Sequence, residues 1–222
     1  MRVAPNRHPI ASPRRRRRKH GQGLVEFMIV APVFFFVIFA MVDGGLLLYS
    51  INAVDQSTTV GSNSIAGLGL ASNADIGSLQ KMSTAGLQTT SLVKVTEIDV
   101  EELVTNATND GFSTHADGTP VIQTGCAGGP TGVDGANECV NRYKYSGATV
   151  VVMDAWSSCL MSSGDPSQCP PWPPAVRNVV NGHSSFVALK VSYSYHFFTQ
   201  VGGNFNLTAL KTFRLEPETN AS

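Results

Sequence analysis

A single carboxylate, Glu26, lies inside a long apolar run, and its position is the first feature of the chain that suggests chemistry. The run extends from Leu24 to Tyr49, and Asp43 is its only other charged residue. A carboxylate carried into a membrane costs free energy, so such residues are usually paired or functional. Two interpretations remain open: a paired carboxylate with a functional role, and one that lies at headgroup depth in contact with water.

Four cysteines in the second half of the chain are the next candidates. An even number on an oxidising side of a membrane favours disulfides, and four cysteines allow three pairings. Short polar loops with Gly, Pro and Asp favour pairing Cys126 with Cys139, and Cys159 with Cys169. A closed loop of that size contributes about 3 kcal/mol. Neither spacing is C-x-x-C and no histidine is close to either pair, so we expect no metal and no cofactor.

The remaining reactive groups form no recognisable catalytic set. Four acidic residues fall close together: Glu97, Asp99, Glu101 and Glu102. They could bind a cation, but a solvated strand edge explains them equally well. Three histidines of the C-terminal region are scattered: His115, His183 and His196. Without a convincing nucleophile and base, the chain is not expected to be an enzyme.

Charge is distributed unevenly along the sequence. Eight of the sixteen Lys and Arg residues lie in the first nineteen positions, and no Asp or Glu precedes Glu26. Residues 22–222 therefore carry eight cations against sixteen carboxylates, a formal charge of −8. A basic head and an acidic body indicate two compartments. No aromatic residues interleave the Arg14–Lys19 cluster and an apolar span follows at once, so no nucleic-acid partner is expected.

The apolar run is predicted to be a transmembrane helix. At a rise of about 1.5 Å per residue it can cross a hydrocarbon layer of roughly 30 Å. Pro32 should kink or loosen it near the carbonyl of Met28, because proline has no N–H to donate. The Arg14–Lys19 cluster should stay in the cytoplasm, which leaves the residues after the span outside. A cleaved secretory signal also begins with positive charge, but this run is longer than an ordinary h-region and has no A-x-A site at its end.

Helical spacing continues beyond the span. Within residues 50–70, small or apolar residues recur at helical spacing: Ile51, Val54, Ser57, Thr58, Gly61 and Ile65. Small side chains let helices approach closely, which suits either bundling in an assembly or packing on the protein's own domain. Asn73 and Asp75 then supply N-cap chemistry for a second helix that should end near Gln88.

The remainder has the pattern of short strands and turns. Residues 92–100 and 147–154 are rich in β-branched residues. From Phe186 to Phe198 apolar and polar residues alternate, which predicts a half-buried strand. A turn at residues 202–204 then leads to an antiparallel partner that ends near Leu215. We therefore expect an α+β fold in which a helix lies on an antiparallel sheet.

The N-terminal segment resembles a known family. GQGLVEFMIVAPVFFFVIFAMVDGGLLLY is similar to the N-terminal helix of TadE-like proteins, the minor pseudopilins of tight-adherence (Flp-type) pili. The shared features are a basic leader and a small residue, followed by Val25-Glu26-Phe27, Pro32 and Asp43-Gly44-Gly45. Leu46 departs from the family pattern, which often has a basic residue there. The resemblance covers about residues 14–55.

The resemblance implies a processing site. Prepilins of the Flp type are cut after a glycine, with glutamate fifth and an aromatic residue sixth in the mature chain. A cut after Gly21 makes Gln22 the first mature residue, Glu26 the fifth and Phe27 the sixth. A cut after Gly23 would lose this register. The new α-amine of Gln22 would be cationic near neutral pH, and in pilin-like assemblies such an amine pairs with the glutamate of a neighbour.

We therefore expect a TadE-like minor pseudopilin with four parts. These are a basic cytoplasmic leader (1–21), a transmembrane helix (22–49), a helical stalk with a second helix (50–90) and an extracytoplasmic α+β domain with disulfide-closed loops (91–222). The expected partners are the membrane, prepilin peptidase, and the other pilins and pseudopilins of the pilus or of a related secretion apparatus. The expected location is the cytoplasmic (inner) membrane, with a single pass and the N-terminus inside. An uncleaved signal-anchored cell-envelope binding domain and a tethered extracytoplasmic hydrolase are the alternatives.

Overall fold

The structure is a computed structural model of the 222-residue chain. It describes residues 22–68, 71, 74–87, 92–126, 129–132, 134–146, 149–152, 172, 174, 177, 185–199 and 203–215. The chain divides into two compact units, Met1–Val42 and Asp43–Ser222. The basic leader with Gly21, and the predicted pair Cys159 and Cys169, lie outside the described residues.

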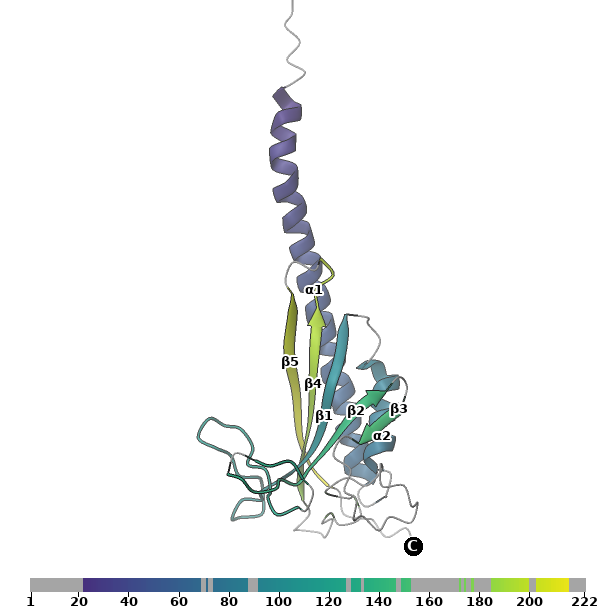
Figure 1. Ribbon diagram of the computed structural model, residues 1–222, viewed down its shortest axis with the longest axis vertical. Helices are drawn as coiled ribbons and strands as arrows, with labels where there is room; N and C mark the ends of the chain where they lie inside the picture. The colour runs from purple at the N-terminus through teal and green to yellow at the C-terminus, as the bar shows by residue number, and fades with distance from the viewer. Residues whose placement is uncertain are drawn as a thin grey trace, which may run out of the picture. The chain divides into compact units, whose positions relative to one another are not determined.

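A long apolar helix, α1 (Gln22–Leu68), begins the described chain (Figure 1). It confirms the predicted N-terminal apolar helix and continues through Pro32. In the first unit its large apolar side chains are exposed, for example Phe27 at 68% and Met41 at 72%. Among the described residues it is the one helix long and apolar enough to cross a membrane.

The second unit contains a five-stranded antiparallel sheet in the order β3-β2-β1-β4-β5. The strands are β1 (Val93–Leu103), β2 (Val140–Ser146), β3 (Thr149–Val152), β4 (Phe186–His196) and β5 (Asn204–Arg214). β1 and β4 pair along their whole lengths, with an irregularity between Val95 and Glu97. β4 and β5 pair from Phe186↔Arg214 to His196↔Asn204, as the alternating pattern and the intervening turn predicted. The expected α+β fold is therefore confirmed.

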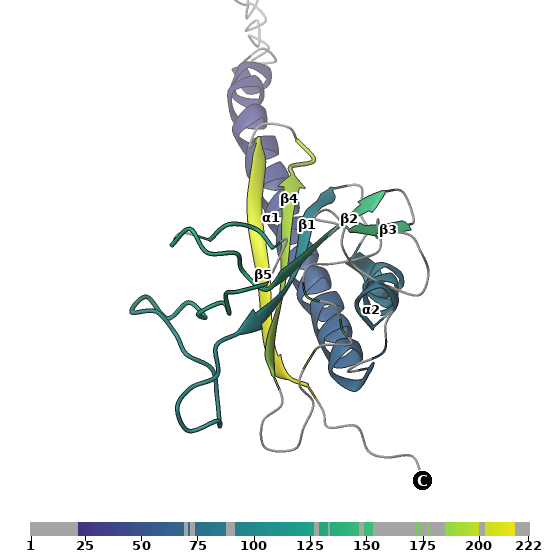
Figure 2. The ribbon, with the colours of Figure 1, turned by 60° about the horizontal axis from the view of Figure 1, so that its bottom comes forward.

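Helices cover one face of this sheet (Figures 1 and 2). They are the part of α1 that follows Asp43 and helix α2 (Ala74–Met82), which continues as a π-helical turn, η1 (Ser83–Leu87). Gly86 has a φ of 118°, a left-handed conformation that favours glycine, and it ends the helix close to the predicted boundary. Alternate residues of the strands meet the helices in one core that includes Val54, Ile65, Leu79, Met82, Ile98, Val100, Leu189 and Val191.

The opposite face of the sheet carries a long excursion of the chain between β1 and β2. We call the described residues between 104 and 138 the arm; Figure 2 shows most of it on the far side of the sheet from α2, whereas its Cys126 packs against the helix-side core. A small second core of Leu103, Phe186 and Ala188, with Phe112 packed against it, joins the arm to the sheet. The first half of β4 is therefore buried on both faces, since Ala188 and Leu189 are both 0% exposed. The prediction of a half-buried strand is wrong there, because the arm covers the second face.

Candidate functional site

The N-terminal candidate residues lie in the first turns of α1. Gln22 is the first residue of the helix, and Glu26 and Phe27 are both exposed. From residue 22 to Val42, Glu26 is the only charged residue, and the large apolar side chains around it are exposed. Exposed apolar surface of this extent marks a site of contact with lipid or with another protein. This unit therefore presents one carboxylate on a surface suited to apolar surroundings.

Asp43, the second acid of the apolar run, is 6% exposed at the start of the second unit. Its Oδ1 accepts a hydrogen bond from the Phe198 backbone N–H at 3.0 Å, and its Oδ2 accepts one from the Thr199 hydroxyl. The Tyr195 hydroxyl donates to the Asp43 carbonyl oxygen at 3.5 Å. Hydrogen bonds to an ionised acceptor are about twice as strong as neutral ones. The carboxylate thus attaches α1 to the end of β4 and the turn that follows it.

The small residues that follow on α1 face the protein's own domain. Ser57 and Thr58 are 0% exposed and Ser62 is 4% exposed. A Cβ atom at Gly61 would lie 2.2 Å from the Sδ of Met82 and 3.0 Å from the Cδ2 of Leu189. Helix α2 and strand β4 therefore pack closely against α1 at these small residues. Of the two interpretations of this stretch, packing on the protein's own domain is the one observed.

A buried polar network, not predicted from the sequence, joins α2 to the sheet. Asp75 Oδ2 accepts hydrogen bonds from Asn141 Nδ2 at 3.0 Å, from the Tyr143 hydroxyl at 2.7 Å and from Arg177 Nη2 at 2.5 Å. Burial raises the pKa of Tyr143 well above its ordinary value, and the charge of Asp75 adds to that effect. The Arg177 guanidinium carbon lies 4.4 Å from the centre of the Trp172 ring. These groups are buried, so the network has the character of a structural element.

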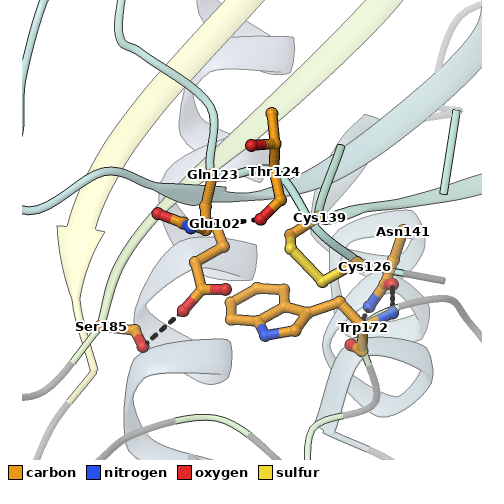
Figure 3. Close-up of a disulfide and its surroundings, with 8 residues drawn as sticks. All are labelled: Glu102, Gln123, Thr124, Cys126, Cys139, Asn141, Trp172 and Ser185. Atoms are coloured by element: carbon orange, nitrogen blue, oxygen red, sulfur yellow. Dashed lines mark hydrogen bonds between the residues drawn. A yellow bond between two sulfur atoms is a disulfide. The ribbon is translucent and has the colours of Figure 1, made fainter. Parts of the chain in front are cut away.

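Cys126 and Cys139 form a disulfide beside this network (Figure 3), which confirms the predicted pairing. They are 13 residues apart in sequence, with Cα atoms 4.9 Å apart. The Trp172 ring packs in the same core as the two sulfur atoms. Asn141 holds the Trp172 backbone through two hydrogen bonds, of 2.7 and 2.8 Å. The disulfide therefore ties Cys126, inside the arm, to the residue directly before β2.

Glu102 lies next to this disulfide (Figure 3), and Ser185 donates a hydrogen bond to its Oε1 at 2.9 Å. Among the described residues, the Glu102 carboxylate and the sulfur atoms of Cys126 and Cys139 are the one group of three possible metal ligands that lies within 4.8 Å. Both sulfur atoms are already joined to each other. The thiolates that a zinc or iron site requires are therefore used by the disulfide.

The predicted acidic cluster divides between the two faces of β1. Asp99 and Glu101 point to the face that carries the arm and are only 3% and 5% exposed, whereas Glu102 lies on the helix side by the disulfide. β1 is the central strand of the sheet. The interpretation of these acids as a solvated strand edge is therefore wrong for Asp99 and Glu101.

One ammonium group serves both of these buried acids. Lys190 Nζ, on β4, lies 3.1 Å from Asp99 Oδ2 and 3.5 Å from Glu101 Oε1. Burial raises the pKa of Asp99 to about 7, although the charge of Lys190 acts in the opposite direction. Burial also raises the pKa of Glu101, again against the effect of Lys190. The two carboxylates thus share a single countercharge.

The family model for TadE-like protein matches residues 21–62. The match confirms the resemblance read from the sequence and places its outer limit at residue 62, beyond the expected residue 55. It includes Glu26, Phe27, Pro32 and Asp43, together with the small residues that α1 buries against the domain. No match to the chain was found among curated proteins or among solved structures.

Proposed function

We propose that this protein is a membrane-anchored minor pseudopilin of TadE type that takes part in assembling a tight-adherence (Flp-type) pilus or a related secretion apparatus. The observation that carries the proposal is the TadE-like match over residues 21–62, which falls on the helix with the exposed apolar surface. TadE-like pilus components are structural, so the proposed role is non-catalytic. Its proposed partners are prepilin peptidase and the other pilins and pseudopilins of the system.

The proposed membrane span is the first unit of the structure. Leu24 to Val42 is nineteen residues, which at about 1.5 Å per residue is close to the roughly 30 Å of a hydrocarbon core. Asp43 then makes its hydrogen bonds within the folded domain, which argues for an outer end of the span near residue 42 rather than 49. The Arg14–Lys19 cluster supports an inner N-terminus, and the disulfide supports an oxidising compartment for the domain.

The proposed assembly step depends on cleavage after Gly21. The cut would leave a cationic α-amine on Gln22, at the start of α1, and Glu26 one helical turn further along. In a filament, the amine of a neighbouring chain would supply the countercharge for Glu26. Pairing of this kind reduces the cost of holding a carboxylate in apolar surroundings.

Intact mass measurement of the membrane-extracted protein tests the processing step. In cells that carry prepilin peptidase we expect a mature chain that begins at Gln22, and Gly21→Val should block its formation. Gly23→Ala is the matched control, because a Cβ atom at Gly23 meets nothing within 4 Å and the predicted cut is unchanged. Retention of residues 1–21 in the native protein would contradict processing and favour the uncleaved signal anchor.

A second experiment tests the role of Glu26. Glu26→Ala should impair piliation and leave membrane insertion intact, because removing a charge from an apolar helix makes insertion easier. Asp55→Ala is the control on the same helix: Asp55 forms a surface ion pair with Lys211 at 2.9 Å, and such pairs contribute roughly 0–1 kcal/mol. Normal piliation of the Glu26→Ala strain would count against the pairing role.

A further inference from the structure

A pocket open to solvent lies between the arm and the sheet, on the face of the sheet opposite α1 and α2. Its volume is about 540 Å³. Its floor is formed by residues of three neighbouring strands, among them Glu101, Lys190 and Leu210, and its walls by arm residues, among them Pro120, Val121 and Glu138. All of these residues belong to the unit that begins at Asp43. The pocket is therefore a property of the sheet domain alone.

The charges around this pocket do not balance. Glu101, Asp134 and Glu138 contribute three carboxylates; among the described lining residues Lys190 supplies the only Lys or Arg side chain, and His115 is the one histidine. Lys190 is shared, since it lies closer to Asp99 (3.1 Å) than to Glu101 (3.5 Å). Asp99 is not among the residues that line the pocket, so Glu101 shares Lys190 with a carboxylate that lies outside it. One further positive charge would therefore be stabilised in the pocket.

The lining also indicates what kind of cation fits. In the part of the chain that the structure describes, no three possible metal ligands converge in this pocket; the one such group found lies at the disulfide. Apolar side chains, including Pro120, Val121 and Leu210, line the pocket together with the carboxylates. Lys and Arg side chains combine an apolar stem with a charged head, and sites of this mixed character suit such groups.

We propose that this pocket binds an alkylammonium or alkylguanidinium group, presented as the lysine or arginine side chain of a partner polypeptide. The stem packs against Pro120, Val121 and Leu210, and the cationic head lies between Glu101 and Glu138. There it supplies the countercharge that Lys190 provides only in part. The inference does not rest on cleavage at Gly21 or on pilus assembly, so it can fail while the proposed function holds.

The test uses the full chain in detergent micelles and isothermal titration calorimetry. The probe is the tripeptide acetyl-Gly-Lys-Gly-amide, and its control is the norleucine analogue, which keeps the stem and lacks the amine. The lysine peptide should bind at least tenfold more tightly than the norleucine peptide. Equal affinity for the two peptides would overturn the proposal. Cadaverine distinguishes the sources: tighter binding of this free diamine than of the lysine peptide would overturn the assignment to a polypeptide.

Three variants locate the site. Glu101→Gln should weaken binding of the lysine peptide at least tenfold, and Glu138→Gln at least threefold. Glu97→Gln is the matched control, because Glu97 is on the same face of β1 and outside the pocket, and it should bind like the native chain. An equal loss in Glu97→Gln would overturn the location. If buried Glu101→Gln fails to fold by circular dichroism, Glu138→Gln decides, since Glu138 is partly exposed and unchanged affinity there would overturn the proposal.

Discussion

Replacing Gly61 with alanine measures how closely α1 packs on α2 and the sheet, and replacing Gly67 provides its control. Both glycines lie in the same helix. At Gly67 an added Cβ atom would meet nothing within 4 Å, whereas at Gly61 it would lie 2.2 Å from Met82 Sδ and 2.6 Å from Met82 Cγ. The two variants therefore make the same chemical change in different surroundings.

The expected difference follows from two opposing terms. Alanine in place of glycine stabilises a helix interior by about 0.5–1 kcal/mol, and by less in a last turn such as that of Gly67. At Gly61 this gain is opposed by overpacking, which costs about 1–3 kcal/mol. Met82 and Leu189 are both 0% exposed, so neither can move into solvent to relieve the contact. Gly61→Ala should therefore be about 1–3 kcal/mol less stable than Gly67→Ala.

Urea unfolding of the full chain in detergent, followed by tryptophan fluorescence, measures both variants, because Trp172 lies in the same core as Met82. A double-mutant cycle adds a further check. Met82→Ala alone should cost about 2–5 kcal/mol through the cavity that it leaves. In combination with Gly61→Ala the cost should be smaller than the sum by at least 1 kcal/mol, since the new methyl group fills part of that cavity.

Two results would refute this reasoning. The first is a Gly61→Ala variant as stable as Gly67→Ala, which would mean that the helix does not approach α2 and β4 so closely. The second is additive free energies in the cycle with Met82→Ala, which would mean that the two side chains do not share the same space.

Three further predictions concern buried groups. Burial raises the pKa of Asp99 from 3.8 to about 7, so between these values the folded chain keeps a proton that the unfolded chain releases. Asp99 should therefore make stability fall as the pH rises from about 4 to about 7, by up to about 1.4 kcal/mol per pH unit; urea titrations at several pH values should show this slope, and Asp99→Asn should remove the contribution of Asp99 and leave that of Glu101 and Glu102, whose pKa values burial also raises. Replacing Cys126 and Cys139 with serine should cost about 3 kcal/mol in the same assay, and a native peptide map that joins either cysteine to a different one would contradict the pairing. Asp75→Asn should cost about 3–5 kcal/mol, because it removes the hydrogen-bonded countercharge of the buried Arg177 guanidinium, and adding Arg177→Met should restore most of that loss; a double variant no more stable than the single one would argue against the charge pair.

Patterns within a few consecutive residues predicted the helices and strands whose apolar residues recur with a regular period. The apolar run predicted α1, and the alternation from Phe186 predicted β4 with β5 as its antiparallel partner. The short polar loop between Cys126 and Cys139 predicted the disulfide. β2 was missed because VNRYKYS, residues 140–146, places polar residues on both faces. Its buried residue Asn141 faces inward because Asp75, 66 positions earlier, accepts its hydrogen bond.

The candidate sites were determined by sequence and by tertiary structure to different degrees. The register of Gly21, Gln22 and Glu26 can be read from the sequence alone, and it stays a prediction, as does the pairing of the remaining two cysteines. The burial of Asp99 and Glu101 could not be predicted from the sequence. Their shared partner, Lys190, lies on β4, about 90 residues further along the chain, and no local pattern brings it next to β1.

By itself, the sequence determined where this protein has an apolar helix, most of its strands and a short disulfide loop. Those features follow from the period of apolar residues and from turn chemistry, both of which act over a few positions. Only the tertiary structure decided which surfaces are free. It showed that the small residues of α1 are buried against the protein's own sheet domain. It also showed that Asp99 and Glu101, two acids of a central strand, share Lys190. The physical reason is that burial and charge pairing depend on contacts between segments far apart in sequence, which no local pattern specifies.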